Sequence, residues 1–223
     1  MSRCFLRDTS AAIEALMHDD PFMMGVAVYT PVGSEAELAD LLPAHFKMLA
    51  QRHGDLGLRL AGAAEDLFSL GFSAVCLVGS DSPTLPVENL RATATILKEG
   101  ADRMVIGPCT DGGYYLVGMN RPYTKLFEEI DWSTGSVYEQ TIGRSKEINL
   151  PMVELPVWYD VDDKDSLNRL ISELFPEWSM GELPQGAPAP NTKAFIHRLL
   201  SAENAARVWP AMTACQLERR ERR

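Results

Sequence analysis

Residues 75–86 read VCLVGSDSPTLP, in which four apolar residues run directly into a polar turn that carries the carboxylate of Asp81. Apolar residues without polar alternation predict a strand, over residues 72–78, that is covered on both faces of a sheet. In open α/β sheets ligands bind beyond the carboxyl ends of the strands, which favours a functional role for Asp81. The competing interpretation is an ordinary Asx or Ser turn that leads into a helix after Pro86.

The segments on either side of this strand alternate between helical and β patterns. Helices are predicted around residues 5–17, 35–51, 56–67, 86–97, 136–145, 165–175 and 192–206, and further strands over 24–29, 104–106, 114–119 and 152–159. Gly71 and Gly100 stand where helix ends favour a left-handed residue. This order predicts a three-layer α/β/α fold built on one mainly parallel, mixed sheet.

Composition narrows the class of protein. The 223 residues are 46% hydrophobic, which is enough for one sizeable core and one main domain. The net charge of −10 disfavours nucleic acids and anionic membranes as partners, although a divalent cation can reverse that sign locally. No apolar run reaches 18 residues and no N-terminal stretch joins a basic region to an apolar one, so neither a membrane span nor export is expected. Four scattered cysteines (Cys4, Cys76, Cys109 and Cys215) agree with a reducing, cytoplasmic location.

A second group of carboxylates follows the predicted strand 152–159. It consists of Asp160, Asp162, Asp163 and Asp165. One of the last three can cap the following helix, and the others suit the positive end of its dipole. Capping alone rarely needs four acids. Carboxylates from two strand ends that meet across the sheet would form an oxygen-rich site for Mg²⁺ or Mn²⁺, which would also bind a diphosphate.

Residues 107–119, GPCTDGGYYLVGM, predict a tight turn that returns into a strand. The Gly112–Gly113 pair allows positive φ angles and leaves N–H groups free for a sugar or phosphate, while Asp111 could bind a hydroxyl. The alternative is a plain hairpin turn. Cys109 is disfavoured as a nucleophile because no histidine lies near it in the sequence.

Five segments together carry a resemblance to a known family: GDLGLRL (54–60), VGSDSPTLP (78–86), GPCTDGGYYLVGM (107–119), IDWSTGSVYEQT (130–141) and WYDVDDKDSL (158–167). Over residues 4–175 the chain resembles bacterial GT-A-like glycosyltransferases of the radical-SAM/selenodomain-associated type. These belong to the nucleotide-diphospho-sugar transferase superfamily. The resemblance implies that superfamily's fold over residues 1–176. Composition and helical pattern then predict a Gly/Pro-rich linker (177–191) and a C-terminal helix and tail (192–223).

The resemblance also implies roles for individual residues. Asp81 matches the metal-binding aspartate at the strand end, Asp162 matches the second ligand, and Asp160 is a nearby substitute for it. Asp111 lies in the acceptor or sugar-side loop and is the nearest candidate for a catalytic base. Arg59 is expected to contact the nucleotide, or else to be a solvent-facing helix residue. The full set of expected substrate-binding residues is Arg59, Ser80, Ser82, Gly112 and Gly113.

One departure from the family concerns the N-terminus. Family members open with a strand and a glycine-containing loop bearing Lys and Arg, whereas MSRCFLRDT lies about where their first helix begins. The sheet is therefore expected to lack its first strand. Such a gap would expose hydrogen-bonding groups in the middle of the sheet, so either assembly into a homo-oligomer or instability is expected.

Three functions follow as expectations. The first is glycosyl transfer from a nucleotide-activated sugar to a small-molecule acceptor, with Mg²⁺ or Mn²⁺ on Asp81 and Asp162 stabilising the leaving diphosphate. The second is nucleotidyl transfer from an NTP to a phosphorylated acceptor. The third is a non-catalytic domain that binds a sugar or a partner protein.

Overall fold

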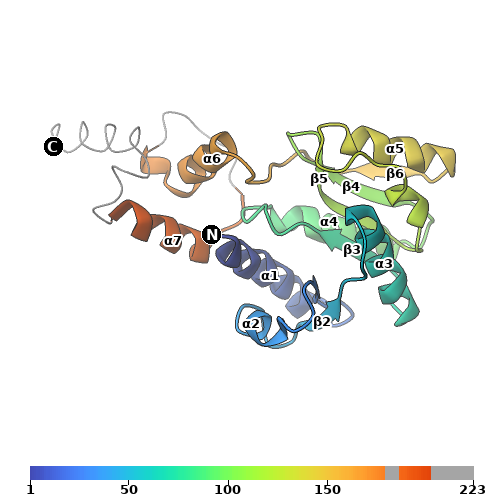
Figure 1. Cartoon of the computed structure of the whole chain (residues 1–223), viewed down its shortest axis with the longest axis horizontal. Coiled ribbons are helices and arrows are strands. Elements are labelled where there is room, and N and C mark those ends of the chain that lie inside the picture. Colours follow the sequence, from blue (N-terminus) through green and yellow to red (C-terminus); the bar gives the residue numbers. More distant parts are fainter. Residues whose placement is uncertain (179–185, 202–223) are drawn as a thin grey trace.

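The computed structural model describes residues 1–178 and 186–201, in which helices surround two small sheets (Figure 1). The helices are α1 (Ser2–Asp19), α2 (Glu35–Ala39), α3 (Leu56–Ser69), α4 (Val87–Lys98), α5 (Val137–Glu147), α6 (Lys164–Leu174) and α7 (Pro190–Ser201), with 3-10 turns η1 (Thr124–Phe127) and η2 (Pro176–Trp178). The strands are β1 (Val26–Tyr29), β2 (Lys47–Ala50), β3 (Val75–Val78), β4 (Met104–Pro108), β5 (Tyr114–Met119) and β6 (Met152–Glu154).

The strands form two separate sheets. The larger has the order β3-β5-β4-β6, in which β5 is antiparallel to both neighbours and β4 is parallel to β6. The smaller consists of β1 and β2, which are parallel. This mixed α/β arrangement agrees with the predicted fold class, but the single continuous sheet is corrected to two, because β1 and β3 do not pair.

Helices cover both faces of the larger sheet, and side chains alternate between two cores as a pleated strand requires. On β4, Val105 points into the core that also holds residues of α1, α4, α6 and α7, while Met104 and Ile106 point into the core shared with α3 and η1. All three side chains are fully buried. The molecule is therefore built in three layers.

Two predicted elements are corrected by the structure. Residues 35–51 do not form one helix, because α2 ends at Ala39 and β2 begins at Lys47. Pro43 lies between them and disfavours helix in the residue before it. The strand expected over residues 152–159 ends at Glu154. Pro156 follows, and Trp158 then resumes pairing through an isolated bridge to Cys109. The part of the helix 192–206 beyond Ser201, and the part of the linker at residues 179–185, lie outside the described residues.

The two ends of the described chain are joined by a buried cap. Asp8 of α1 is only 3% exposed, and its carboxylate accepts hydrogen bonds from the backbone N–H groups of Asn191 (3.0 Å) and Thr192 (2.8 Å) at the start of α7. These N–H groups have no partner within their own helix, so an acid from another helix supplies it. α7 is thereby fixed against α1.

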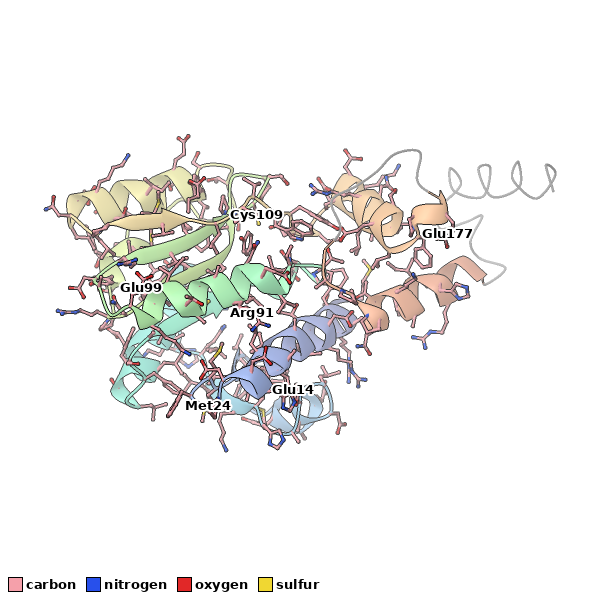
Figure 2. The ribbon with its side chains drawn as sticks, turned by 180° about the vertical axis from the view of Figure 1, so that it is seen from behind. Glu14, Met24, Arg91, Glu99, Cys109 and Glu177 are labelled. Carbon is pink, nitrogen blue, oxygen red and sulfur yellow. The ribbon has the colours of Figure 1, made fainter. Side chains whose placement is uncertain are left out.

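α1 also lies beside α4, where Arg91 forms an ion pair with Asp19 at 2.8 Å (Figure 2). Lys98, at the end of α4, pairs with Asp20, which directly follows α1. The two helices therefore run in the same direction, with their C-terminal ends together. In the part of the chain that the structure describes, no helix has the length and apolarity needed to cross a membrane.

Candidate functional site

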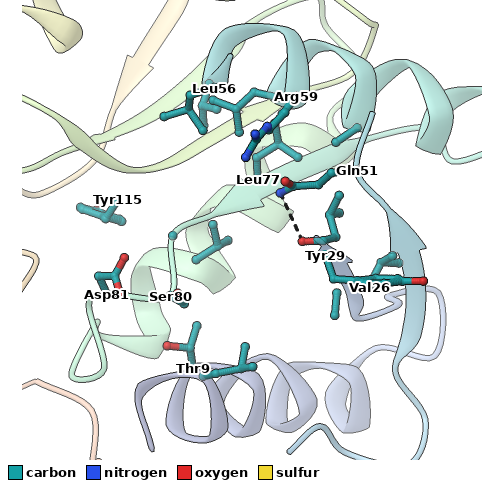
Figure 3. Close-up of a pocket in the computed structure, with 18 of the residues that line it drawn as sticks. Thr9, Val26, Tyr29, Gln51, Leu56, Arg59, Leu77, Ser80, Asp81 and Tyr115 are labelled. Carbon is teal, nitrogen blue, oxygen red and sulfur yellow. Dashed lines mark hydrogen bonds between the residues drawn. The ribbon is translucent and has the colours of Figure 1, made fainter. Parts of the chain in front are cut away.

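A hollow of about 1110 Å³ lies between the two sheets. Figure 3 shows Thr9 of α1 on one side and Leu56 and Arg59 of α3 on the other, with β1 and β3 forming the remaining walls. At the carboxyl ends of β1 and β3 the wall becomes polar. We call this end the mouth, and it is lined by Ser80, Asp81, Asp111, Gly113, Tyr114, Trp132, Ser133, Thr134, Gly135, Asp160 and Asp162.

Backbone hydrogen bonds bring the acidic segments of the mouth together. The carbonyl of Asp81, just beyond β3, accepts from the N–H of Val161 at 2.9 Å. The N–H of Thr110 donates to the carbonyl of Trp158 at 3.1 Å, which ties the turn after β4 to the same segment. Acids that are far apart in the sequence therefore meet at one edge of the fold, as predicted for Asp81, Asp160 and Asp162.

The carboxylates of the mouth repel one another. Burial, and then the charge of Asp111, raise the pKa of Asp160 to about 6, with smaller contributions from Asp162 and Asp81. Burial and the charge of Asp162 raise the pKa of Asp81. A hydrogen bond from Ser80 partly offsets that effect. A cation at this place would relieve the repulsion.

Cys109 lies beside these acids, although the sequence argument had set it aside. Its Sγ and one carboxylate oxygen each of Asp111 and Asp160 lie within 4.8 Å of one another. The side chain is buried, and burial together with the nearby acids raises the pKa of the thiol. A protonated thiol is a poor nucleophile, and Mg²⁺ and Mn²⁺ prefer oxygen ligands. Cys109 therefore forms the apolar back wall of the acidic cluster.

The four acids after β6 divide into two roles. Asp163 is the N-cap of α6, and its carboxylate accepts from the N–H of Ser166 at 2.8 Å in a capping box. Asp165 is exposed in the first turn of the helix. Asp160 and Asp162 line the mouth. Capping thus accounts for one acid, and two others face the hollow.

The turn that carries Asp111 is held by its own backbone. The N–H of Cys109 donates to the carbonyl of Gly113, and the N–H of Gly113 donates to Oδ1 of Asp111, both at 2.9 Å. Gly112 has a φ angle of +91°, and a Cβ there would lie 2.1 Å from the carbonyl oxygen of Gly135. Only glycine fits this contact, which packs the Asp111 turn against the loop before α5.

The predicted substrate-binding residues occupy different places. Ser80 and Gly113 line the mouth, and Arg59 lines the wall formed by α3, where its Nε donates to the carbonyl of Gly54 at 2.8 Å. Gly112 allows the close contact between the Asp111 turn and the loop before α5. Ser82 is only 3% exposed and lies outside the lining, and its carbonyl accepts from the N–H of Leu85 in the turn before α4.

Sequence reasoning quoted the loop 131–136 within a resemblance segment but gave its residues no role, and the structure places Trp132, Ser133, Thr134 and Gly135 of this loop in the mouth. Trp132 packs edge-on against Tyr114, with ring centroids 6.5 Å apart. The signal was present in the motif IDWSTGSVYEQT, where a Trp, two hydroxyl residues and a Gly precede a helix. Such a loop combines an aromatic surface with hydroxyl groups, which suits a sugar or a base.

The raised pKa of Asp160 predicts how the stability of the metal-free chain depends on pH. Because its folded-state pKa of about 6 exceeds the ordinary value of 3.8 for an aspartate, folding favours the protonated form. Its favourable contribution is complete below pH 3.8 and is lost as the pH rises through about 6. The side chain is half exposed, so we expect Asp160→Asn to stabilise the metal-free protein by only about 1 kcal/mol at pH 7.

The measurement is urea unfolding of both proteins at pH 4 and pH 7 in EDTA. We expect the difference in the free energy of unfolding to vanish near pH 4. The other carboxylates titrate in both proteins, so their contributions cancel in the difference between the two free energies of unfolding. An equal difference at both pH values would contradict the repulsion.

Comparisons with known proteins show which family the chain belongs to. The model for the family described as "Uncharacterized protein conserved in bacteria (DUF2064)" matches residues 13–134, more than half of the chain. Among solved structures, a crystal structure from Desulfovibrio desulfuricans G20, described as a "putative nucleotide-diphospho-sugar transferase", is similar with a TM-score of 0.69 and 28% sequence identity. The alignment covers 89% of this chain and 81% of that one. No curated protein matches the chain.

The structural match confirms the predicted α/β fold of the GT-A, nucleotide-diphospho-sugar transferase type. It also agrees with the resemblance drawn from the five sequence segments. The family match spans α3, β3 and both acidic turns at Asp81 and Asp111, and it ends within the loop of Trp132. The chain belongs to the DUF2064 family of bacterial proteins.

Proposed function

We propose that the protein is a metal-dependent transferase that uses a nucleotide-activated sugar. The observation that carries the proposal is the convergence of Asp81, Asp111, Asp160 and Asp162 at the mouth of the hollow. The name of the Desulfovibrio protein, a nucleotide-diphospho-sugar transferase, supports the same class of donor.

The donor atoms at the mouth suit Mg²⁺ or Mn²⁺. Asp81, Asp160 and Asp162 offer carboxylate oxygens, the ligands that these cations prefer. Burial and the charges of neighbouring acids raise the pKa values of Asp81 and Asp160, and a cation at this place would offset both effects. The ion would supply positive charge that stabilises the leaving diphosphate.

Arg59 on the α3 wall and the other residues of the mouth bind and orient the substrates. The Arg59 guanidinium, whose Nε is held by Gly54, lies on the α3 wall where it can pair with a phosphate of the donor. Trp132 and Tyr114 form an aromatic wall for the sugar or the base. Ser133 and Thr134 offer hydroxyl groups at the same place.

Asp111 is the proposed general base. The N–H of Gly113 holds one of its oxygens, which fixes the direction of the carboxylate. In the transfer step the acceptor hydroxyl oxygen bonds to the anomeric carbon of the sugar while the bond from that carbon to the diphosphate oxygen breaks. The hydroxyl proton moves to Asp111, and the nucleoside diphosphate leaves with the electron pair.

Calorimetry tests the proposal. We expect at least one UDP- or GDP-sugar to bind the chain in the presence of Mn²⁺ and to lose most of its affinity in EDTA. Titration with NTPs under the same conditions is the comparison. Metal-dependent binding of an NTP with release of pyrophosphate would favour nucleotidyl transfer instead. If neither class of nucleotide binds with Mn²⁺, the domain is not a nucleotide-dependent transferase.

A further inference from the structure

A cluster of hydrogen-bonded side chains lies next to the acidic mouth but contributes nothing to its lining. At its centre is Glu173, near the end of α6, whose Oε2 accepts hydrogen bonds from the hydroxyls of Tyr159 and Thr84. Tyr159 and Thr84 are each only 1% exposed, and their hydroxyl oxygens lie 3.2 Å apart. None of the three side chains lines the hollow, so the cluster is separate from the groups proposed to touch the cation and the substrates.

The cluster joins the two strand ends that carry the acids. Thr84 follows Asp81 by three residues in the turn after β3, and Tyr159 directly precedes Asp160 in the segment after β6. The Thr84 hydroxyl lies 3.2 Å from Oε2 of Glu173. One carboxylate oxygen therefore holds a side chain from each of the two segments that supply the proposed metal ligands.

This link acts together with a backbone hydrogen bond between the same segments. The N–H of Val161, two residues after Tyr159, donates to the carbonyl of Asp81 at 2.9 Å. A single hydrogen bond leaves two segments free to rotate about it, whereas a second one at another place fixes their orientation as well as their separation. Glu173 therefore restricts the angle at which Asp81 and Asp160 face each other.

The other oxygen of Glu173 holds a third segment of the chain. Oε1 accepts from the N–H of Gly186 at 3.0 Å, and the N–H of Ala187 donates to the carbonyl of Thr84 at 2.8 Å. A Cβ at Gly186 would lie 2.1 Å from that carbonyl oxygen and 2.5 Å from Oε1 of Glu173. Because the backbone lies this close, it leaves the carboxylate little freedom to turn.

The hydrogen bonds of the cluster require a carboxylate. A carboxylate can accept at both oxygens, and Glu173 does so. Glutamine has the same shape but only one acceptor oxygen, so its NH₂ group would face either the N–H of Gly186 or the two hydroxyls. Burial raises the pKa of Glu173, and the three hydrogen bonds and the charge of Arg169 oppose that effect.

We propose that Glu173 is the positioning residue of the acidic mouth, which holds the Asp81 turn against the Asp160 segment and thereby sets the affinity of the site for a divalent cation. This inference rests on the proposed function, because the cation is part of it. Groups that orient metal ligands without touching the metal contribute roughly 10- to 100-fold to metal affinity. Glu173 itself takes no part in the transfer step.

The test is a calorimetric titration of the native chain and of Glu173→Gln with Mn²⁺ alone. We expect the affinity of the variant to fall at least about tenfold while the number of sites stays the same. A role limited to stability would instead lower the number of competent molecules and leave their affinity unchanged. Such a result, or unchanged binding in every respect, would overturn the proposal.

Glu35→Gln is the matched control. Glu35 also accepts from a tyrosine hydroxyl and a backbone N–H, those of Tyr29 and Gly33, but these belong to the region of the smaller sheet. The variant loses the same charge and the same kind of hydrogen bonds without a contact to either acidic segment. We expect its affinity for Mn²⁺ to stay within about twofold of the native value. An equal loss in both variants would overturn the proposal in favour of a general effect of charge.

Tyr159→Phe separates the hydrogen bond from the charge of Glu173. It removes one hydroxyl and leaves the net charge unchanged, so it also serves if Glu173→Gln does not fold. We expect a loss of at least about threefold in Mn²⁺ affinity. Combined with Glu173→Gln it should cause no further loss, because both changes break the same link. Fully additive losses would contradict a shared role.

Hydrogen exchange in EDTA tests the geometry without a metal. We expect the Val161 amide to exchange at least about tenfold faster in Glu173→Gln, while the amides of Val105 and Ile106, on a strand paired at both edges, change much less. Unchanged exchange at Val161 would show that Glu173 does not hold the two segments. If the native chain binds neither Mn²⁺ nor a nucleotide sugar, the proposed function fails, and exchange at Val161 alone decides whether Glu173 positions the acids.

Discussion

Replacing Asp81 with Asn is expected to weaken Mn²⁺-dependent binding of a nucleotide sugar by at least about 100-fold, as measured by calorimetry. Asp81 is one of the three oxygen donors proposed for the cation, and an amide oxygen is a neutral and weaker ligand. Its pKa is already raised by burial and by Asp162, so removal of its charge relieves repulsion in the metal-free state. The variant should therefore unfold at a slightly higher temperature in EDTA than the native chain.

Asp165→Asn is the matched control. It makes the same chemical change at an exposed acid in the first turn of α6, outside the lining of the mouth. We expect its nucleotide-sugar affinity to stay within about twofold of the native value. Unchanged affinity in Asp81→Asn would remove Asp81 from the metal site. A similar loss in both variants would indicate a general effect of charge instead of ligation.

The second large effect is expected from Gly112→Ala. At a φ angle of +91° an alanine is strained, and its Cβ would meet the backbone carbonyl of Gly135 at 2.1 Å. Neither atom belongs to a flexible side chain, so the Asp111 turn and the loop 131–136 must separate. We expect a loss of about 3 kcal/mol in the free energy of unfolding, or on the order of 8 °C in Tm. Catalytic activity should fall further than stability, because Asp111 and Trp132 lose their relative positions.

Gly143→Ala provides the control for the change from Gly to Ala. Gly143 lies within α5, and a Cβ there would meet no atom within 4 Å. Alanine favours helix over glycine by roughly 1 kcal/mol, so this variant should be at least as stable as the native chain. If Gly112→Ala unfolds at the native temperature, the two loops do not pack as described.

Much of the fold could be predicted because the local sequence of most segments favours the same helix or strand that the segment forms in the folded protein. The run VCLV forms β3 as its β-prone apolar residues predict, although only Val75 of the four is buried, and the glycines that end α3 and α4 have the positive φ angles expected. β2 was missed because Lys47, Met48, Leu49 and Ala50 all favour helix when considered alone. Their strand conformation depends on pairing with β1, and such a contact leaves no mark in local composition.

In the candidate site, too, some residues could be predicted from the local sequence and others depend on tertiary contacts. Asp81, Asp160 and Asp162 were predicted because acids that follow apolar strands meet at one edge of a sheet, and all three line the mouth. Ser82 was chosen for its nearness to Asp81 in the sequence, yet the turn directs it into the protein. Trp132 joins the site through a contact between loops, which sequence spacing does not encode.

The cap that Asp8 places on α7 has a consequence for how the protein unfolds. If α7 detaches, a carboxylate that is only 3% exposed loses both backbone N–H partners while it remains enclosed by the body of the protein. That penalty couples melting of the last described helix to loosening of the first one. We therefore expect the cooperative unit of folding to extend through α7, beyond the boundary predicted at residue 176.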